Sequence, residues 1–394
     1  MSAPGRDACA AALVGLPTMT PVRLARLLAG RDPVEVWTSL VRGGPGADPR
    51  FAAAARSVEP EREGERYRRA GVAILLPGDE AYPARLLGDP GAPAVLFARG
   101  RPACLAGRQS VALVGTRSAT PYGRQVAAEL GRDLASAGVA VVSGLARGID
   151  GAAHAGALRG GGEDPGPPVA VVGTGPDVVY PATNAALWAS VAERGAVLSE
   201  SPLGSPARPG AFPARNRIIA ALAQVVVVVE SHHRGGSLHT AEAAARRGIP
   251  VGAVPGSVKS PSSAGTNGLL VDGCIPVRDA EDVLVAVSLA SGDRPAPAPV
   301  PEAGTLVAAR GRHRRASRSP APVAGPPPTS PSGRPLPAPG TPDRVVYDAV
   351  DAEPTTVEAV LLRTGLSVAD TAGACRRLVD HGLLRAGAGW WSRR

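Results

Sequence analysis

A glycine-rich turn near the middle of the chain has the composition of a phosphate-binding turn. In VVSGLARGIDGAAH (residues 141–154), a β-branched run stops at Ser143 and Gly144, and the chain then bends through Arg147 and Gly148 into small, helix-forming residues. A glycine turn between a strand and a helix lets backbone N–H groups approach an oxyanion, and the helix N-terminus favours negative charge. The pattern therefore predicts that this turn holds a phosphate group.

Other apolar runs end in segments of the same kind. GTR ends the preceding run, FPARNRIIA places two arginines and an asparagine ahead of an apolar helix, and GGSLHTAEAA and VPGSVKS follow later runs. Ligands of open α/β sheets bind outside the carboxyl ends of the strands, so these segments are predicted to line one site where Arg117 and Arg147 converge. The predicted nucleic-acid contacts are Gly115, Thr116, Arg117, Ser143, Gly144, Arg147, Gly148, Phe212, Arg215, Asn216, Arg217, Gly236, Ser237 and Lys259.

The first two turns do not match the common nucleotide-binding fingerprints. A nicotinamide-dinucleotide enzyme would need G-x-G-x-x-G at the first turn and an acidic residue at the end of the next strand. This chain has GTRSATPYG and Ser143 at those places, and its only lysine, Lys259, lies outside any Walker loop. We therefore expect no such cofactor, and we interpret Asp150 as a helix cap rather than a catalytic acid.

Aromatic and acidic residues also fall at the strand exits. The aromatic residues are Tyr122, Tyr180 and Phe212, and the acids are Asp177, Glu200 and Glu230. The aromatic rings either stack on bases, as in proteins that bind single strands, or anchor loops, and the sequence leaves both readings open. The sequence establishes no pairing among the acids, so a nucleotide-processing hydrolase stays as the alternative function.

The charge and the cysteines restrict the class of protein. The net charge of +9 rests on arginine and indicates a polyanionic partner, although the codon bias of a GC-rich genome explains it equally well. The four cysteines lie far apart without a C-x-x-C pair, and His232, His233 and His239 read as loop residues, so neither a metal site nor a disulfide is predicted. A reducing cytoplasm fits best. The longest apolar stretch, 218–229, is too short for a membrane span.

The periodicity of the middle of the chain predicts an α/β fold. Six apolar runs recur between residues 111 and 256, most of them continuous rather than alternating, with Ala-rich helical segments between several of them. Continuous runs are typical of strands covered on both faces, so we expect a Rossmann-like, doubly wound and mostly parallel sheet. The segment 71–100, punctuated by Pro and Gly, reads as a connecting layer.

The flanks have a different composition. The expected organisation is a small helical domain of helix-hairpin-helix or SAM-like type (1–65), the core with its entry layer (66–292), a disordered Pro/Ala-rich linker (293–340) and a winged helix (341–394). The winged helix is expected to have three short helices, the last opened by a capping box from Ser367 to Asp370, and a two-stranded wing.

The ordered blocks resemble the DNA-processing protein A family, DprA or Smf. They are GTR, SGLARGIDGAAH, GTGPDVVYPATN, SE, FPARNRIIA, GGSLHTAEAA, and VPGSV with GTN. The resemblance implies a non-enzymatic core that binds single-stranded DNA without sequence preference and loads the recombinase RecA in DNA uptake and natural transformation. It also implies a homodimer and places Arg117, Arg147, Arg215 and Arg217 at the DNA. Ala221-Leu222-Ala223 and Gly235 depart from the family pattern and put local hydroxyl contacts in doubt.

The winged helix has two interpretations of its own. Arg376 and Arg377 on its third helix would face a DNA major groove if it reads duplex DNA. Winged helices also serve as protein contacts, and the sequence does not separate these roles.

Overall fold

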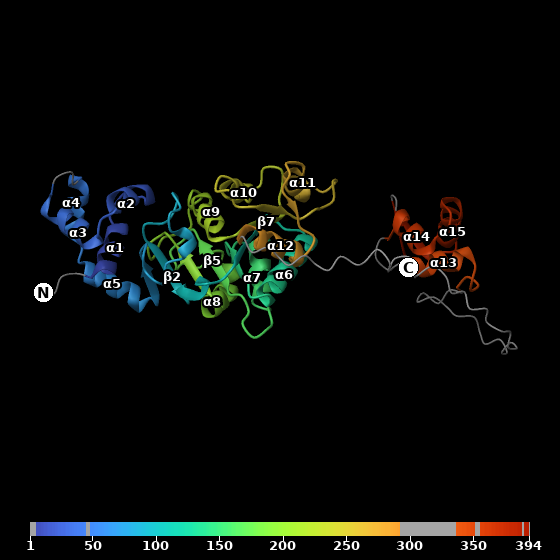
Figure 1. Ribbon diagram of the computed structural model, residues 1–394, viewed down its shortest axis with the longest axis horizontal. Coiled ribbons are helices and arrows are strands. Elements are labelled where there is room, and N and C mark those ends of the chain that lie inside the picture. Colours follow the sequence, from blue (N-terminus) through green and yellow to red (C-terminus); the bar gives the residue numbers. More distant parts are fainter. Residues whose placement is uncertain (1–4, 45–47, 292–335, 351–354, 388–389, 394) are drawn as a thin grey trace. The chain divides into compact units, whose positions relative to one another are not determined.

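The structure, a computed structural model, describes residues 5–44, 48–291, 336–350, 355–387 and 390–393 (Figure 1). The chain divides into two compact units, residues 1–300 and 301–394. Most of the predicted linker lies outside the described residues.

A nine-stranded sheet forms the centre of the first unit. Its strand order is β1-β2-β6-β5-β4-β3-β7-β8-β9, and the pairs from β6 to β9 are all parallel. The six apolar runs of the sequence form β3 to β8, which confirms the predicted Rossmann-like sheet. The strands are β1 (Val72–Leu75), β2 (Leu96–Gly100), β3 (Ser110–Gly115), β4 (Ala140–Ser143), β5 (Pro168–Val172), β6 (Ala196–Ser199), β7 (Val225–Glu230), β8 (Val251–Ala253) and β9 (Ile275–Pro276).

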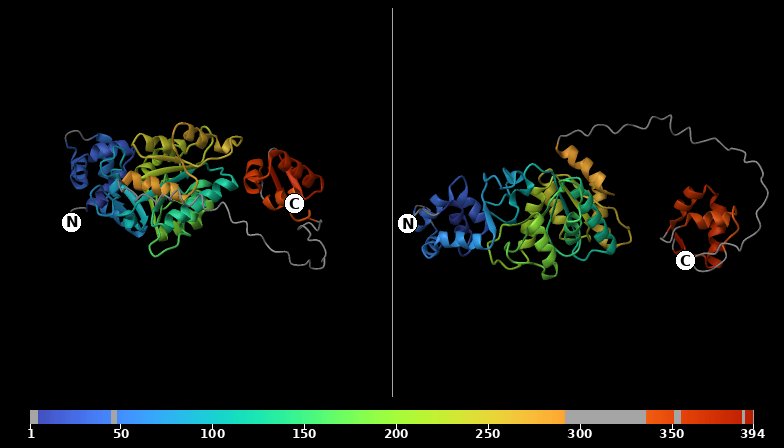
Figure 2. Two further views of the ribbon diagram at one scale, coloured as in Figure 1. Left: turned by 45° about the vertical axis from the view of Figure 1, so that its right-hand side comes forward. Right: turned by 90° about the horizontal axis from the view of Figure 1, so that it is seen from below.

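Helices cover both faces of this sheet (Figures 1 and 2). Val111 and Leu113 of β3 pack with α6, α7 and α12, whereas Ala112 and Val114 of the same strand pack with α9 and α10. Because side chains alternate along a strand, burial on both faces explains the continuous apolar runs. The helices are α6 (Pro121–Ser136), α7 (Ile149–Ala157), α8 (Ala185–Arg194), α9 (Ala211–Leu222), α10 (Leu238–Ala245), α11 (Ala264–Val271) and α12 (Ala280–Ser291).

The predicted connecting layer belongs to the sheet. β1 and β2 form an antiparallel pair, and β2 also pairs antiparallel with β6, so this segment extends the sheet beyond its parallel part. Most of its Pro and Gly residues lie in the loop between the two strands, where the 3-10 helix η1 also occurs. The 3-10 helices of this and later loops are η1 (Ala84–Leu86), η2 (Pro102–Leu105), η3 (Ala182–Asn184) and η4 (Pro261–Ser263).

Five helices at the N-terminus pack together, and α1 and α5 of this group pack on β1. The rings of Tyr67 and Phe97 stack with centroids 4.7 Å apart, and the Tyr67 hydroxyl accepts a hydrogen bond from the Leu203 N–H at 3.2 Å. The N-terminal helices therefore share an apolar core with the edge of the sheet. They are α1 (Arg6–Val14), α2 (Pro21–Leu28), α3 (Pro33–Arg42), α4 (Pro49–Ala55) and α5 (Pro60–Arg69).

The second unit has three helices and a three-stranded sheet. Ser367 opens the third helix, where its hydroxyl accepts the Asp370 N–H, as the capping box predicts. Arg377 pairs with Asp343 of the first helix at 2.6 Å. The elements are α13 (Pro342–Ala349), β10 (Thr355–Thr356), α14 (Val357–Thr364), α15 (Val368–Asp380), β11 (Leu384–Gly387) and β12 (Trp390–Arg393). Among the described residues, no helix combines the length and apolar character needed to cross a membrane.

Candidate nucleic-acid interface

A cavity of about 740 Å³ lies at the carboxyl ends of the central strands. The exit of β3, the first turns of α9 and the start of α10 supply most of its walls, as expected for an open α/β sheet. We call it the sheet-edge cavity. Eight of the predicted contacts line it, namely Gly115, Thr116, Arg117, Phe212, Arg215, Asn216, Gly236 and Ser237.

An arginine and two aromatic rings are stacked at this cavity. The Arg117 guanidinium lies 4.7 Å from the centroid of the Phe212 ring, and the Tyr180 ring lies 5.4 Å from the same ring at an interplanar angle of 35°. Arg117 is exposed and forms no ion pair with any residue that the structure describes. Its charge is therefore available to an anion, while the rings present apolar faces.

The start of α10 forms another wall of the sheet-edge cavity. Gly236 is exposed, and a side chain there would meet open space, so the backbone is accessible to a ligand. Ser237 is buried, and its hydroxyl donates to the Ser231 hydroxyl at 2.9 Å. The Asn216 side chain donates to the Gly236 carbonyl at 3.4 Å and so ties α9 to this turn. A helix N-terminus in this position favours a negatively charged group.

Arg215 lines the sheet-edge cavity but is mostly buried. It is 6% exposed, and its guanidinium donates to the Val171 carbonyl at 2.6 Å, whereas its Nε has no hydrogen-bond partner among the described residues. A Cβ on Gly144 would overlap this guanidinium, so the glycine of the second turn makes room for Arg215. Burial lowers the pKa of Arg215 to about 10 and leaves it charged at neutral pH.

Asp150 and His154 are buried beside Arg215. Burial raises the pKa of Asp150, against the opposing effects of the Arg215 charge and of the Ala146 and Gly144 N–H groups. The capping interpretation of Asp150 is wrong, because the N-cap position of α7 is Gly148 and no side chain caps it. Both ring nitrogens of His154 lack a hydrogen-bond partner among the described residues, and burial lowers its pKa to about 3.

The six other predicted contacts lie outside the lining of the sheet-edge cavity. Arg147 and Lys259 are exposed on neighbouring loops, so Arg117 and Arg147 do not both line it. The buried Ser143 hydroxyl donates to the Leu113 carbonyl at 2.6 Å. A side chain on Gly148 would overlap the Thr116 carbonyl. The remaining two are Gly144, which accommodates Arg215, and Arg217, which is paired elsewhere.

The carboxylates of the three acids at strand ends each accept hydrogen bonds from other parts of the chain. Asp177 accepts the Gly204 N–H at 2.9 Å, and Glu230 accepts both the N–H and the hydroxyl of Thr120 at 2.8 Å. Glu200 accepts from Arg217 at 2.7 Å through both carboxylate oxygens. These partners give each acid a structural role.

The sequence did not identify several residues that line the cavity. Ala207 and Pro209 come from the loop before α9, and His239 lies in the first turn of α10, not in a loop as interpreted. Thr240 is buried at the same wall. A helix periodicity starting at Leu238 is the signal that places His239 and Thr240, whereas nothing in the loop composition marks Ala207 or Pro209.

Comparison with known proteins identifies the family of the chain. A family model for DNA recombination-mediator protein A matches residues 73–288, and the putative DNA processing protein DprA of Mycobacterium tuberculosis is 39% identical over 296 residues, 70% of this chain and 74% of that protein. The chain belongs to the DNA-processing protein A family. Another relative, protein Smf of Escherichia coli, is 42% identical over 212 residues, 53% of this chain and 55% of that protein.

A solved structure of the family has the same fold. The X-ray structure of DNA processing protein A from Streptococcus pneumoniae matches with a TM-score of 0.62 and 31% identity, covering 72% of this chain and 98% of that chain. The family match at residues 73–288 includes all the strands from β3 to β9 and therefore every wall of the sheet-edge cavity.

Proposed function

We propose that the sheet-edge cavity binds single-stranded DNA without sequence preference. The observation that carries the proposal is the exposed Arg117 guanidinium stacked on Phe212, with Tyr180 beside it. Proteins that bind single strands combine cationic grooves with aromatic rings on which bases stack. Membership of the DNA-processing protein A family supports the same conclusion.

The contacts divide into phosphate and base contacts. Arg117 and the start of α10 meet the phosphates, and the faces of Phe212 and Tyr180 meet the bases. Arg147 and Lys259, exposed on neighbouring loops, extend the cationic track outside the cavity. Arg215 acts through its position beneath Gly144 and Val171, because most of its surface is covered.

Replacing Arg117 tests this assignment. Arg117→Ala is expected to weaken binding to an oligothymidylate by about tenfold, the equivalent of one lost stacking and phosphate contact. Arg147→Ala is expected to have a smaller effect, because Arg147 lies outside the cavity. Fluorescence anisotropy of a labelled oligonucleotide measures the affinity of both variants. In the wild type, the logarithm of the affinity should fall linearly with the logarithm of the salt concentration, with a slope of roughly 0.7 for each phosphate contacted.

Arg159 provides the matched control. It is exposed and follows the C-terminal end of α7, whereas the sheet-edge cavity lies near the N-terminal end of that helix. Arg159→Ala removes one charge but should bind as the wild type does. Undiminished binding by both Arg117→Ala and Arg147→Ala would overturn the assignment.

The proposal extends to the partners. We infer that the DNA-bound chain loads RecA in the cytoplasm during DNA uptake and recombination, as the family model's description as a recombination mediator supports. Loading should then fall in parallel with DNA binding in Arg117→Ala. A homodimer through the core is part of the same proposal, and Val285 and Leu289, 46% and 65% exposed one turn apart on α12, offer an apolar surface for it.

The hydrolase alternative receives less support. Asp177, Glu200 and Glu230 are all engaged by N–H, hydroxyl or guanidinium groups of the protein. Incubation with nucleoside monophosphates separates the two functions, because a DNA-binding protein without catalytic activity releases no base.

A further inference from the structure

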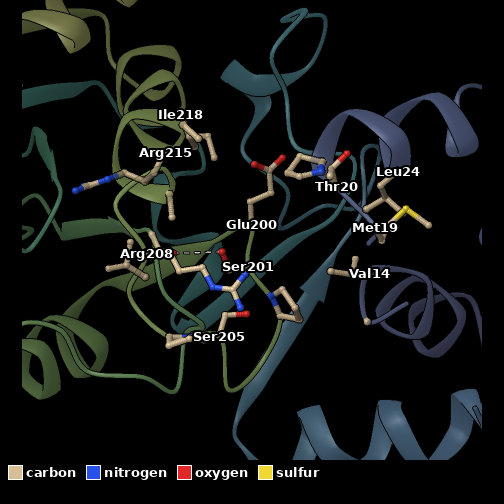
Figure 3. A pocket seen from close by; sticks show the side chains of 18 of the residues that line it. Val14, Met19, Thr20, Leu24, Glu200, Ser201, Ser205, Arg208, Arg215 and Ile218 are labelled. Carbon is tan, nitrogen blue, oxygen red and sulfur yellow. Dashed lines mark hydrogen bonds between the residues drawn. The ribbon is translucent and has the colours of Figure 1, made fainter. Parts of the chain in front are cut away.

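A second cavity lies on the other side of α9. Its volume is about 450 Å³, and it lies between the N-terminal helices and the core. Figure 3 shows Val14, Met19 and Leu24 on one side and Arg215 and Ile218 on the other, with Glu200 and Ser201 between them. We call it the flanking cavity. Its walls combine strand-exit residues such as Gly173 and Glu200 with N-terminal residues that the sequence did not assign to any site.

The walls of the flanking cavity differ in polarity. Met19, Leu24 and Ile218 form apolar walls, whereas Glu200, Ser201 and Ser205 add a carboxylate and two hydroxyls. A flat ring with polar groups along one edge suits such a cavity, because methionine packs favourably against aromatic rings. A nucleobase has this combination of an apolar face and a hydrogen-bonding edge.

The two cavities share one wall. Arg215 lines both of them, and neighbouring residues in the first turn of α9 face different cavities, Ala211 the flanking one and Phe212 the sheet-edge one. The loop before α9 alternates in the same way, with Arg208 lining the flanking cavity and Pro209 the sheet-edge cavity. A helix with its side chains is about 10 Å across, so a strand a few nucleotides long can cross this wall.

The charges favour a DNA strand at this wall. Arg208 is exposed and forms no ion pair with the described residues, so its guanidinium is available to a phosphate. The one acid that lines the cavity, Glu200, is neutralised by Arg217 at 2.7 Å. Its carboxylate oxygens retain lone pairs that can accept N–H groups of a base.

We propose that the flanking cavity is a second base-binding site for the same DNA strand, with Arg208 contacting the phosphates that cross the wall. The proposal rests on the function proposed for the sheet-edge cavity. It makes the N-terminal helices part of the DNA-binding surface, because Met19 and Leu24 supply the apolar wall. A base enters the flanking cavity only when the strand is long enough to reach from one cavity to the other.

Oligonucleotide length provides the test. With labelled oligothymidylates of about 4 to 16 nucleotides, affinity for the full-length chain should rise by about tenfold at the length that spans both cavities. Met19→Trp, which places a bulkier ring at the apolar wall of the flanking cavity and obstructs a base there, should abolish this rise and preserve the affinity for the shortest oligonucleotides. Arg208→Ala should reduce the rise without any risk to the core, because Arg208 is exposed.

Two matched variants control for the substitutions. Val22→Trp adds the same ring to α2, where Val22 is 61% exposed and lines neither cavity, and Arg159→Ala removes an arginine remote from both. Both should keep the rise. If Met19→Trp and Arg208→Ala also keep it, the second site is overturned while the first stands. If the wild type binds no oligonucleotide at any length, the proposed function itself is overturned.

Discussion

Arg215 and Arg217 lie two residues apart in α9, and the protein holds them in different ways. Arg215 is 6% exposed and forms no ion pair among the described residues; a backbone carbonyl and the space above Gly144 receive its guanidinium. Arg217 pairs with the carboxylate of Glu200 on the other side of the helix. Neither arginine is a freely exposed cation, whereas Arg117, remote in sequence, is exposed at the cavity. Adjacent charges in a motif therefore need not act on the same ligand.

The largest expected effect on stability concerns His154, the uncharged neighbour of Arg215. His154 has a pKa of about 3 in the folded chain against 6.5 in the unfolded chain, so below pH 6.5 the unfolded chain binds a proton that the folded chain does not. Stability is then lost as the pH falls from 6.5 towards 3, by about 1.4 kcal/mol for each pH unit. His154→Phe should flatten this part of the pH profile, measured by urea unfolding.

Asp150 has the opposite effect on the pH dependence of stability, and it has this effect in both the wild type and His154→Phe. Its pKa is raised by burial, so the folded chain binds its proton more readily and stability falls as the pH rises above the ordinary value of 3.8. The difference between wild type and His154→Phe cancels this contribution. Parallel pH profiles for the two proteins would show that His154 is protonated in the folded chain as easily as in the unfolded one.

A smaller effect is expected from closing the space that Arg215 occupies. Gly144→Ala places a methyl group on the guanidinium and should lower the free energy of unfolding by about 2 to 3 kcal/mol, through overpacking and displacement of a buried charge. Gly161→Ala is the matched control, because a Cβ there meets no atom within 4 Å. Equal stability of the two variants in urea unfolding would contradict the packing described for Arg215.

The smallest effect is expected at Arg217. Its ion pair with Glu200 is partly open to solvent, with side-chain exposures of 27% and 14%, so screening reduces its contribution. A double-mutant cycle of Glu200→Gln and Arg217→Gln should give a coupling of about 1 kcal/mol. A coupling of zero would show that the ion pair between Arg217 and Glu200 contributes nothing to the stability of the protein.

The sequence predicts the sheet well, because its strands are buried on both faces and read as continuous apolar runs. The strands β1 and β2 are less visible, since their runs are short and the loop between them contains many Pro and Gly residues. Their place in the sheet depends on antiparallel pairing with β6, about 100 residues further along the chain. Such long-range pairing leaves no periodic signal.

Part of the candidate site can also be predicted from the sequence. The topology brings strand exits together, so Arg117, Phe212 and Gly236 could be assigned to one site from their motifs. Exposure could not be assigned, because the burial of Arg215 depends on the backbone of two other strands. The flanking cavity also requires the packing of the N-terminal helices, which no local motif specifies.

The hairpin formed by β1 and β2 has a consequence for the solution behaviour of the protein. An uncovered strand at the edge of a sheet can pair with a strand of another molecule, a common route to aggregation. β2 occupies the open side of β6, and at the opposite edge β9 has only two residues, one of which is Pro276. β1, which is the edge strand on the side of β2, has only four residues, so both edges of the sheet are short and offer little backbone for intermolecular strand pairing.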